Sequence, residues 1–111
     1  MPFRGWFVGH FVENAFGLRS TNDVEIKWGV HAERESRSAW GASDEATTLS
    51  ILIQGQIRIS FLGGQEALLR QRGDYALWGP RVSHRWRIEE PDTVVLTVRW
   101  PSRVGDTVDI D

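Results

Sequence analysis

The 111-residue sequence contains no cysteine, so disulfide bonds, thiolate metal sites and thiol nucleophiles are all excluded. Its longest apolar segments, such as 93–98, have the length of a strand and fall far short of the ~20 residues that a membrane helix needs. An excess of charge is also missing, because 13 Lys and Arg residues against 15 Asp and Glu residues give a net charge of -2. This balance argues against a domain that grips phosphate backbones. We therefore expect neither nucleic acid nor a membrane as a partner.

The chain has room for one domain, and we expect residues 1–111 to form it. At the N-terminus, Gly9, His10 and Glu13 interrupt the apolar residues before any small-residue cleavage site appears. The sequence therefore predicts no secretory signal peptide, and a cytoplasmic protein is the expectation.

Sustained helical periodicity is absent, whereas apolar and polar residues alternate in short segments that Gly and Pro separate. Strands are predicted at 24–30, 49–54, 57–61, 67–69, 75–78, 84–88 and 93–100. The N-terminal region 1–20 is predicted to hold an outer strand at 3–12, residues 32–46 to form an irregular loop, and residues 102–111 to form a polar tail. Many short strands without helices predict an all-β sandwich or double-sheet barrel.

The segment from about residue 48 to residue 98 has a distinctive order of features. A strand ends in Gly55, the Gly-Gly pair at 63–64 predicts a tight hairpin, and Gly73 leads through a turn to a strand that begins at His84. This order resembles the cupin superfamily. Gly73 and His84 stand at the spacing of the second cupin motif, although its proline is one place late, at Pro80, and Arg81 replaces its second glycine.

The first cupin motif carries a histidine pair and a glutamate, and here its positions hold other residues. The glutamate position falls on Thr48, and the histidine pair falls near Trp40 and Ala42. The resemblance implies a double-stranded β-helix, or jelly-roll barrel, and a divalent metal such as iron, nickel, manganese or zinc. It also implies activity of an isomerase, lyase or dioxygenase type. Of the four metal ligands of the family, it transfers one position to this chain, His84.

His84 is the leading candidate for a catalytic or metal-binding residue. It alternates in phase with Trp86 and Ile88, so we expect its side chain to point into the barrel. Imidazoles that converge from neighbouring strands bind divalent cations, with their other ring nitrogens held by nearby groups. The alternative is a hydrogen-bonded histidine in a filled core.

His31 and His10 are the other candidate metal ligands. Alternation places His31 with Glu25 and Lys27, away from the apolar face of its strand, unless a bulge at Gly29 reverses the phase. His10 lies among aromatic residues, which suggests burial against another sheet or another subunit. Three histidines from three strands would suit a metal site with open positions. The alternative is that His31 faces solvent at a strand end.

Four further residues are expected to bind a ligand. Trp40 and Trp86 are placed near the barrel mouth, where an indole can stack on a planar or sugar-like molecule, or simply pack. Arg81 is placed at the rim, where its guanidinium can hold a carboxylate or phosphate. Thr48 occupies the position of the family glutamate. The acidic residues of the irregular loop could supply a general base or simply face water; they are Glu33, Glu35, Asp44 and Glu45.

The sequence supports two main hypotheses for function. In one, His84 with His31 or His10 binds a divalent metal that activates a substrate. In the other, the domain binds or senses a small polar or aromatic molecule without metal or catalysis. Metal-free acid-base catalysis by His84 and a loop carboxylate lies between them. An apolar first strand at Phe3–Val12 further predicts a homodimer, because its edge and face need cover.

Overall fold

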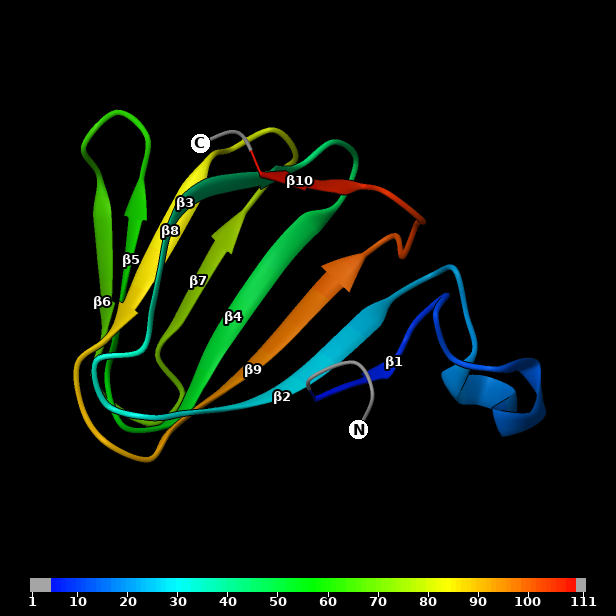
Figure 1. Ribbon diagram of the computed structural model, residues 1–111, viewed down its shortest axis with the longest axis horizontal. Coiled ribbons are helices and arrows are strands. Elements are labelled where there is room, and N and C mark those ends of the chain that lie inside the picture. Colours follow the sequence, from blue (N-terminus) through cyan, green and yellow to red (C-terminus); the bar gives the residue numbers. More distant parts are fainter. Residues whose placement is uncertain (1–4, 110–111) are drawn as a thin grey trace.

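The computed structural model describes residues 5–109, except the side chains of residues 16 and 107–109. Two five-stranded antiparallel sheets face each other and form a flattened barrel (Figure 1). The strands are β1 (Trp6–Val8), β2 (Glu25–His31), β3 (Ser36–Ser43), β4 (Thr47–Gln54), β5 (Ile57–Phe61), β6 (Glu66–Leu69), β7 (Tyr75–Trp78), β8 (His84–Ile88), β9 (Thr93–Trp100) and β10 (Thr107–Asp109), and a 3-10 helix, η1, spans Asn14–Arg19. The predicted all-β class and jelly-roll barrel are confirmed.

Each sheet mixes strands from distant parts of the chain. One sheet has the order β1-β2-β9-β4-β7, and we call it the β9 sheet. The other has the order β10-β3-β8-β5-β6, and we call it the β8 sheet. Consecutive strands such as β4 and β5, or β8 and β9, belong to different sheets, so their connections close one end of the barrel (Figure 1).

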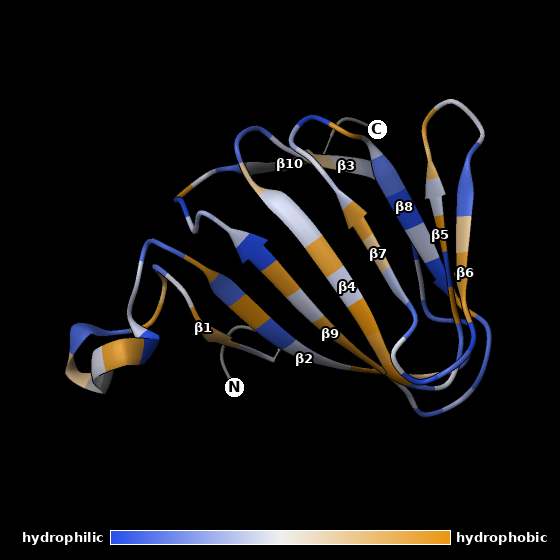
Figure 2. Ribbon diagram, turned by 180° about the vertical axis from the view of Figure 1, so that it is seen from behind, coloured by the Kyte–Doolittle hydropathy of each residue, from blue (hydrophilic) through white to orange (hydrophobic). Residues whose placement is uncertain are grey.

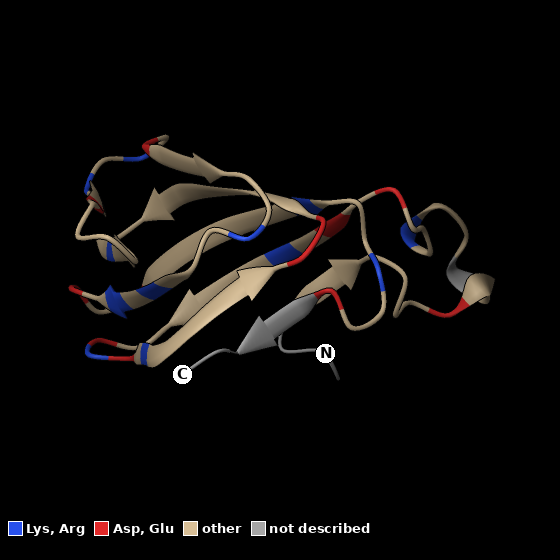
Figure 3. Ribbon diagram, turned by 90° about the horizontal axis from the view of Figure 1, so that it is seen from above, with Lys and Arg blue, Asp and Glu red and all other residues tan. Residues whose placement is uncertain are grey.

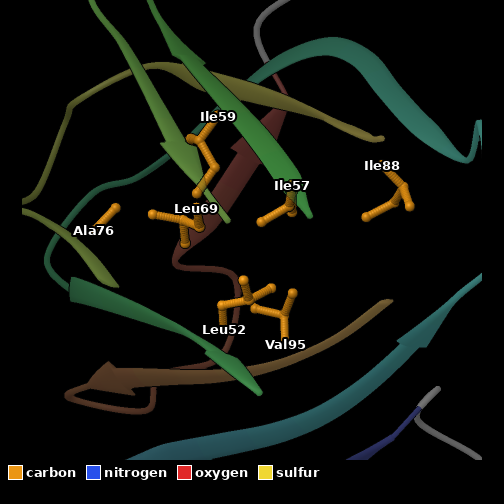
Figure 4. Close-up of a cluster of buried hydrophobic side chains, with 7 residues drawn as sticks. All are labelled: Leu52, Ile57, Ile59, Leu69, Ala76, Ile88 and Val95. Atoms are coloured by element: carbon orange, nitrogen blue, oxygen red, sulfur yellow. The ribbon is translucent and has the colours of Figure 1, made fainter. Parts of the chain in front are cut away.

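The apolar core lies at that closed end of the barrel. Figure 4 shows side chains of both sheets meeting there, with Leu52 and Val95 on one side and Ile57 and Ile88 on the other. The same cluster includes Ile59, Leu69 and Ala76. Burial of such side chains contributes about 1.5–3 kcal/mol each, so this end of the molecule is the principal source of stability.

Away from the core end, the β9 sheet has a polar inner face, and its outer face is apolar. Towards the β8 sheet, β2 directs Glu25 and Lys27, while Trp28 and Val30 point outwards and are exposed. Figure 2 shows the alternation of polar and apolar residues along β2, β9 and β4. The sequence expectation that the apolar face of β2 points inwards is therefore wrong, and no bulge at Gly29 is needed to bring His31 inside.

Two segments that were not predicted to contain a strand each contain one. The expected loop at 32–46 contains β3, and the expected polar tail contains β10, which pairs with β3 at the sheet edge. The N-terminal outer strand is confirmed at Trp6–Val8, as an edge strand beside β2. Phe3, the predicted start of that strand, lies outside the described residues. Within residues 5–109, no helix has the length and apolar character of a membrane span.

Candidate functional site

The inward side chains of the β9 sheet form the first wall of a pocket, and the strand register shows which of them are neighbours. Its inward side chains form two rows across the sheet, each row made of register neighbours. One row is Glu25, Arg99, Thr48 and Trp78, and the next is Lys27, Thr97, Ser50 and Ala76. Within the first row, Arg99 Nη1 lies 3.3 Å from Glu25 Oε2, with both side chains largely buried. Figure 3 shows charged positions of this kind within the strands as well as in the loops.

The opposite wall comes from the β8 sheet, where His84 and Trp86 point towards the β9 sheet. The imidazole of His84 packs against the indole of Trp78, with ring centroids 4.7 Å apart. Trp86 packs in the same manner against His31, at 4.9 Å. These two histidine–tryptophan pairs join the sheets across the barrel interior.

Between the walls lies a pocket of about 820 Å³. This volume lies within the range of ordinary small-molecule sites. Of the residues that the sequence singled out, five line it: His10, His31, Thr48, His84 and Trp86. Glu35 also lines it, so one of the loop acids expected near the site is present there.

His84 is the most perturbed histidine of this pocket. It is 7% exposed, and its Nδ1 is buried without a hydrogen-bond partner. Burial, together with the positive charges of Arg99 and Arg37, lowers the pKa of His84 to about 4. Polar contacts with the backbone of Val82 and Gly41 oppose this shift only in part. The imidazole is therefore neutral at physiological pH.

Arg37 reaches His84 because of a glycine. Gly41 is the register partner of His84, and the guanidinium of Arg37 lies directly over it, so that a Cβ at Gly41 would stand 2.9 Å from Arg37 Cζ. A register shift in β3 between these two residues accompanies this approach. Glycine at position 41 thus allows a positive charge to lie beside the histidine.

His31 and His10 each make a hydrogen bond within the protein through Nδ1. His31 Nδ1 lies 3.0 Å from Glu35 Oε2, and burial lowers the pKa of His31 although Glu35 opposes this effect. His10 Nδ1 lies 2.6 Å from Ser102 Oγ, and that hydroxyl donates to Glu25 Oε1 at 2.9 Å. Because the single hydroxyl proton points to Glu25, His10 is the donor to Ser102. The network ties the N-terminal segment to the barrel.

The described residues do not fit the divalent metal that the cupin resemblance implies. A metal centre needs several donors at one point, and among residues 5–109 no three His, Asp or Glu side chains form such a group. The expected site of His84, His31 and His10 is therefore not formed, although all three line one pocket. The charges of Arg99 and Arg37, which disfavour a proton on His84, equally disfavour a bound cation there.

Two expected ligand-binding residues lie outside this pocket. Trp40 borders a smaller hollow of about 190 Å³ on the other side of the β8 sheet, where the Arg85 guanidinium stacks 4.3 Å from its ring. Arg81 is exposed in the turn before β8, with a φ of 63°. Neither residue lines the His84 pocket, so the expectation that both lie at its mouth is wrong.

Three residues that define the pocket were not anticipated: Arg37, Trp78 and Arg99. Arg99 lies in β9 among apolar residues. This arrangement could have indicated that one face of the strand is buried and polar. Trp78 lies three places after Tyr75 in a short strand, and only the register with Thr48 reveals its direction.

No protein-family model matches the sequence, and no curated protein matches it. Solved structures do. A Klebsiella pneumoniae protein described as having a double-stranded beta-helix domain matches with a TM-score of 0.70 and 18% identity, over 82% of this chain and 77% of that chain. KdgF from Halomonas sp. matches with a TM-score of 0.65 and 19% identity, over 76% and 74% of the two chains. An oxalate oxidase in complex with the substrate analogue glycolate matches with a TM-score of 0.65 and 14% identity, over 79% and 46%.

The chain has the cupin fold. At these identities the likeness establishes the architecture, and the chemistry must be argued from the pocket itself. In this cupin barrel, a neutral histidine, two indoles and two guanidinium groups stand where the sequence resemblance implies a metal. Such a set of groups suits hydrogen bonding, stacking and attraction of negative charge.

Proposed function

We propose that this cupin-fold chain is a small-molecule binding module that works without a resident metal. Its ligand is a small molecule with an acidic group and a planar or apolar part. The observation that carries the proposal is the neutral imidazole of His84, which lies beside Arg37 and Arg99 in the wall of a pocket of about 820 Å³.

The acidic group follows from the charges that act on His84. Arg37 and Arg99 both lower its pKa, so the potential at the imidazole is positive even though Arg99 pairs with Glu25. A carboxylate placed there is attracted by the guanidinium groups and accepts a hydrogen bond from the neutral ring. The planar part follows from Trp78 and Trp86, whose indoles flank the two histidines.

Titration calorimetry with benzoate, benzamide and benzylamine tests the charge preference directly. These probes share one ring and differ in charge, so we expect binding in the order benzoate, benzamide, benzylamine. Substitution His84→Ala should weaken benzoate binding about tenfold or more. Arg81→Gln, which changes an exposed arginine outside the pocket, should leave it unchanged. A flat response to benzoate at millimolar concentration, or equal binding of all three probes, contradicts the proposal.

Metal analysis of the purified, untagged protein separates this proposal from a metal-dependent enzyme. We expect iron, nickel, manganese and zinc to be far below one equivalent, both after purification and after incubation with each ion followed by desalting. A near-stoichiometric metal that is lost in His84→Ala would establish the enzyme alternative instead. The expected cytoplasmic location stays a prediction.

A further inference from the structure

His31 and Glu35 form a carboxylate–histidine pair in the wall of the ligand pocket. His31 Nδ1 lies 3.0 Å from Glu35 Oε2, and the same oxygen accepts from the backbone N–H of Ala32 at 3.1 Å. Both side chains line the pocket, with 11% of the His31 side chain and 45% of the Glu35 side chain exposed. The pair therefore belongs to the pocket, and the attraction of an acidic group to His84 leaves it without a role.

The carboxylate fixes which nitrogen of His31 carries the proton. A carboxylate only accepts hydrogen bonds, so Nδ1 is the donor to Glu35. Burial lowers the pKa of His31 although Glu35 opposes this effect, so the ring is neutral at physiological pH and carries a single proton. Nε2 is therefore unprotonated, and its lone pair can accept a hydrogen bond.

Nε2 lies over the inner face of the β9 sheet because residue 29 is a glycine. Gly29 is the register partner of Val95, which lines the pocket, and a Cβ at position 29 would stand 2.9 Å from His31 Nε2. The indole of Trp86 contacts the ring from the opposite sheet, with centroids 4.9 Å apart. Among the described residues, the hydrogen bond to Glu35 is the only one that the ring makes. The lone pair of Nε2 is therefore left for a group that enters the pocket.

The pocket thus presents different chemistry at two points. Around His84, the charges of Arg37 and Arg99 make the potential positive, which suits an acidic group. At His31, the Nε2 lone pair and the Glu35 carboxylate are both hydrogen-bond acceptors. Acceptors of this kind disfavour an anion and suit a hydroxyl or amino donor.

Strand β8 sets the distance between these two points. His84 and Trp86 are two positions apart on its inner face, which is about 6.6 Å at about 3.3 Å per residue. The ring centroid of His31 lies 4.9 Å from that of Trp86. A benzene ring with substituents on opposite carbons, extended by a hydrogen bond of about 2.8 Å at each end, bridges a gap of this size.

We infer that His31 is a specificity-determining residue that accepts a hydrogen bond from a hydroxyl or amino group of the ligand, and that Glu35 positions it for this role. The ligand class is accordingly an aromatic acid with a hydroxyl or amino group on the far side of its ring. This inference rests on the proposed function, because it takes the acidic group as bound beside His84. It gives His31 the role of a direct ligand contact in place of the expected metal ligand.

Calorimetry with 4-hydroxybenzoate, 4-aminobenzoate and 4-fluorobenzoate tests this specificity. Hydroxyl and fluorine are similar in size, but only the hydroxyl donates a hydrogen bond. The wild type should therefore bind 4-hydroxybenzoate and 4-aminobenzoate about three- to tenfold more tightly than 4-fluorobenzoate. His31→Phe keeps a planar ring beside Trp86 and should abolish this preference while 4-fluorobenzoate binding is kept.

Two loop variants separate the positioning role of Glu35 from its charge. Glu35→Ala should reduce the preference for 4-hydroxybenzoate, because the proton of His31 is no longer held on Nδ1. Glu33→Ala is the matched control: it removes the same charge from an exposed residue of the same turn, outside the pocket. That variant should keep the full preference.

Nitrogen-15 NMR of the His31 ring gives a readout that does not depend on affinity. At neutral pH the free protein should show a protonated Nδ1 and an unprotonated Nε2, and so should Glu33→Ala, whereas Glu35→Ala should show a mixture of the two tautomers. Addition of 4-hydroxybenzoate should shift the Nε2 signal of the wild type as a new hydrogen bond forms. Addition of 4-fluorobenzoate should leave that signal in place.

The outcomes distinguish this inference from the proposed function. Equal affinities of the wild type for 4-hydroxybenzoate and 4-fluorobenzoate would overturn the inference alone, as long as benzoate binds. A proton on Nε2 of His31 in the free protein, or a preference for the hydroxyl that survives His31→Phe, would also overturn it. Absence of binding by every probe would overturn both.

Discussion

His84 shows how burial decides the chemistry of one residue. Its side chain is almost wholly enclosed, and its pKa lies at about 4, so it meets a ligand as a neutral ring with one proton. A neutral imidazole can donate a hydrogen bond to a carboxylate without the free-energy cost of removing a charged imidazolium from water. The same residue on the surface would titrate near neutral pH and bind anions with a strong pH dependence.

The lowered pKa of His84 makes folding depend on pH. The unfolded chain has a His84 pKa near 6.5 and the folded chain one of about 4, so between these values the unfolded chain binds more protons. The free energy of unfolding therefore rises with pH, by about 3 kcal/mol in all. This contribution is complete above pH 6.5 and is lost as the pH falls through 4. Urea unfolding at pH 4 to 7 measures the slope.

The variant His84→Gln should flatten that slope, because an amide does not titrate. A smaller dependence should persist, since burial also lowers the pKa of His31. The slope is the readout, so an overall loss of stability in the variant does not affect the test. An unchanged slope in His84→Gln would show that His84 is not the titrating group.

At the scale of elements, the β4–β5 connection depends on close contact with β9. Gly55 has a φ of +88°, and a Cβ there would stand 2.6 Å from the Cα of Thr93. Thr93 is fully buried and accepts from the backbone N–H of Gln56 through its hydroxyl, at 3.1 Å. The turn and the start of β9 therefore interlock, and neither can move without disturbing the core end of the barrel.

Gly55→Ala should cost about 3 kcal/mol or more, the sum of an unfavourable φ and a backbone clash. Gly73→Ala is the matched control: Gly73 has a φ of +92° but nothing within 4 Å of its Cβ position. That variant should cost only about 1 kcal/mol. Thermal unfolding of both proteins measures the difference. Equal costs would mean that the conformation alone, and not the contact with Thr93, requires glycine at position 55.

The sequence predicted the strands that carry strong alternation and missed those that do not. The strands at 57–61, 75–78, 84–88 and 93–100 are confirmed with the same bounds. β3 was missed because its inner face carries Arg37, Gly41 and Ser43 in place of apolar residues. Alternation of apolar and polar residues indicates burial against an apolar core. β3 instead lies beside the pocket and next to the edge strand β10.

At the scale of the whole molecule, the prediction of the site was limited by the assumption that the apolar face of a strand points into the barrel. A sequence pattern tells that Trp28 and Lys27 lie on opposite faces of a strand, but not which face is inside. The apolar face was taken as the inner one, so Lys27 was expected outside although it lines the pocket together with Arg99. His84 and Trp86 were placed correctly because the β8 sheet follows the ordinary rule. Whether they bind a ligand stays a prediction.

The barrel divides its interior into an apolar end and a polar end. Along β4 the inward residues change from Leu52 in the core to Ser50 and Thr48 in the pocket. Along β9 they change in register from Val95 to Thr97. Stability calls for apolar residues throughout such an interior, so polar side chains at one end indicate that binding constrains them.

Apolar substitutions at the polar end should therefore lower the affinity for the ligand and keep or raise the free energy of unfolding. The double variant Thr48→Val and Thr97→Val keeps side-chain shape and removes two hydroxyls from the pocket wall, so its free energy of unfolding should stay equal or rise by up to about 1 kcal/mol. Its affinity for benzoate should fall several-fold, as calorimetry would show. Leu52→Ala at the apolar end should do the reverse, costing about 2–5 kcal/mol while affinity at low temperature is kept. If the double variant lost stability without losing affinity, the two hydroxyls would belong to the framework of the barrel and the division into a core end and a binding end would be wrong.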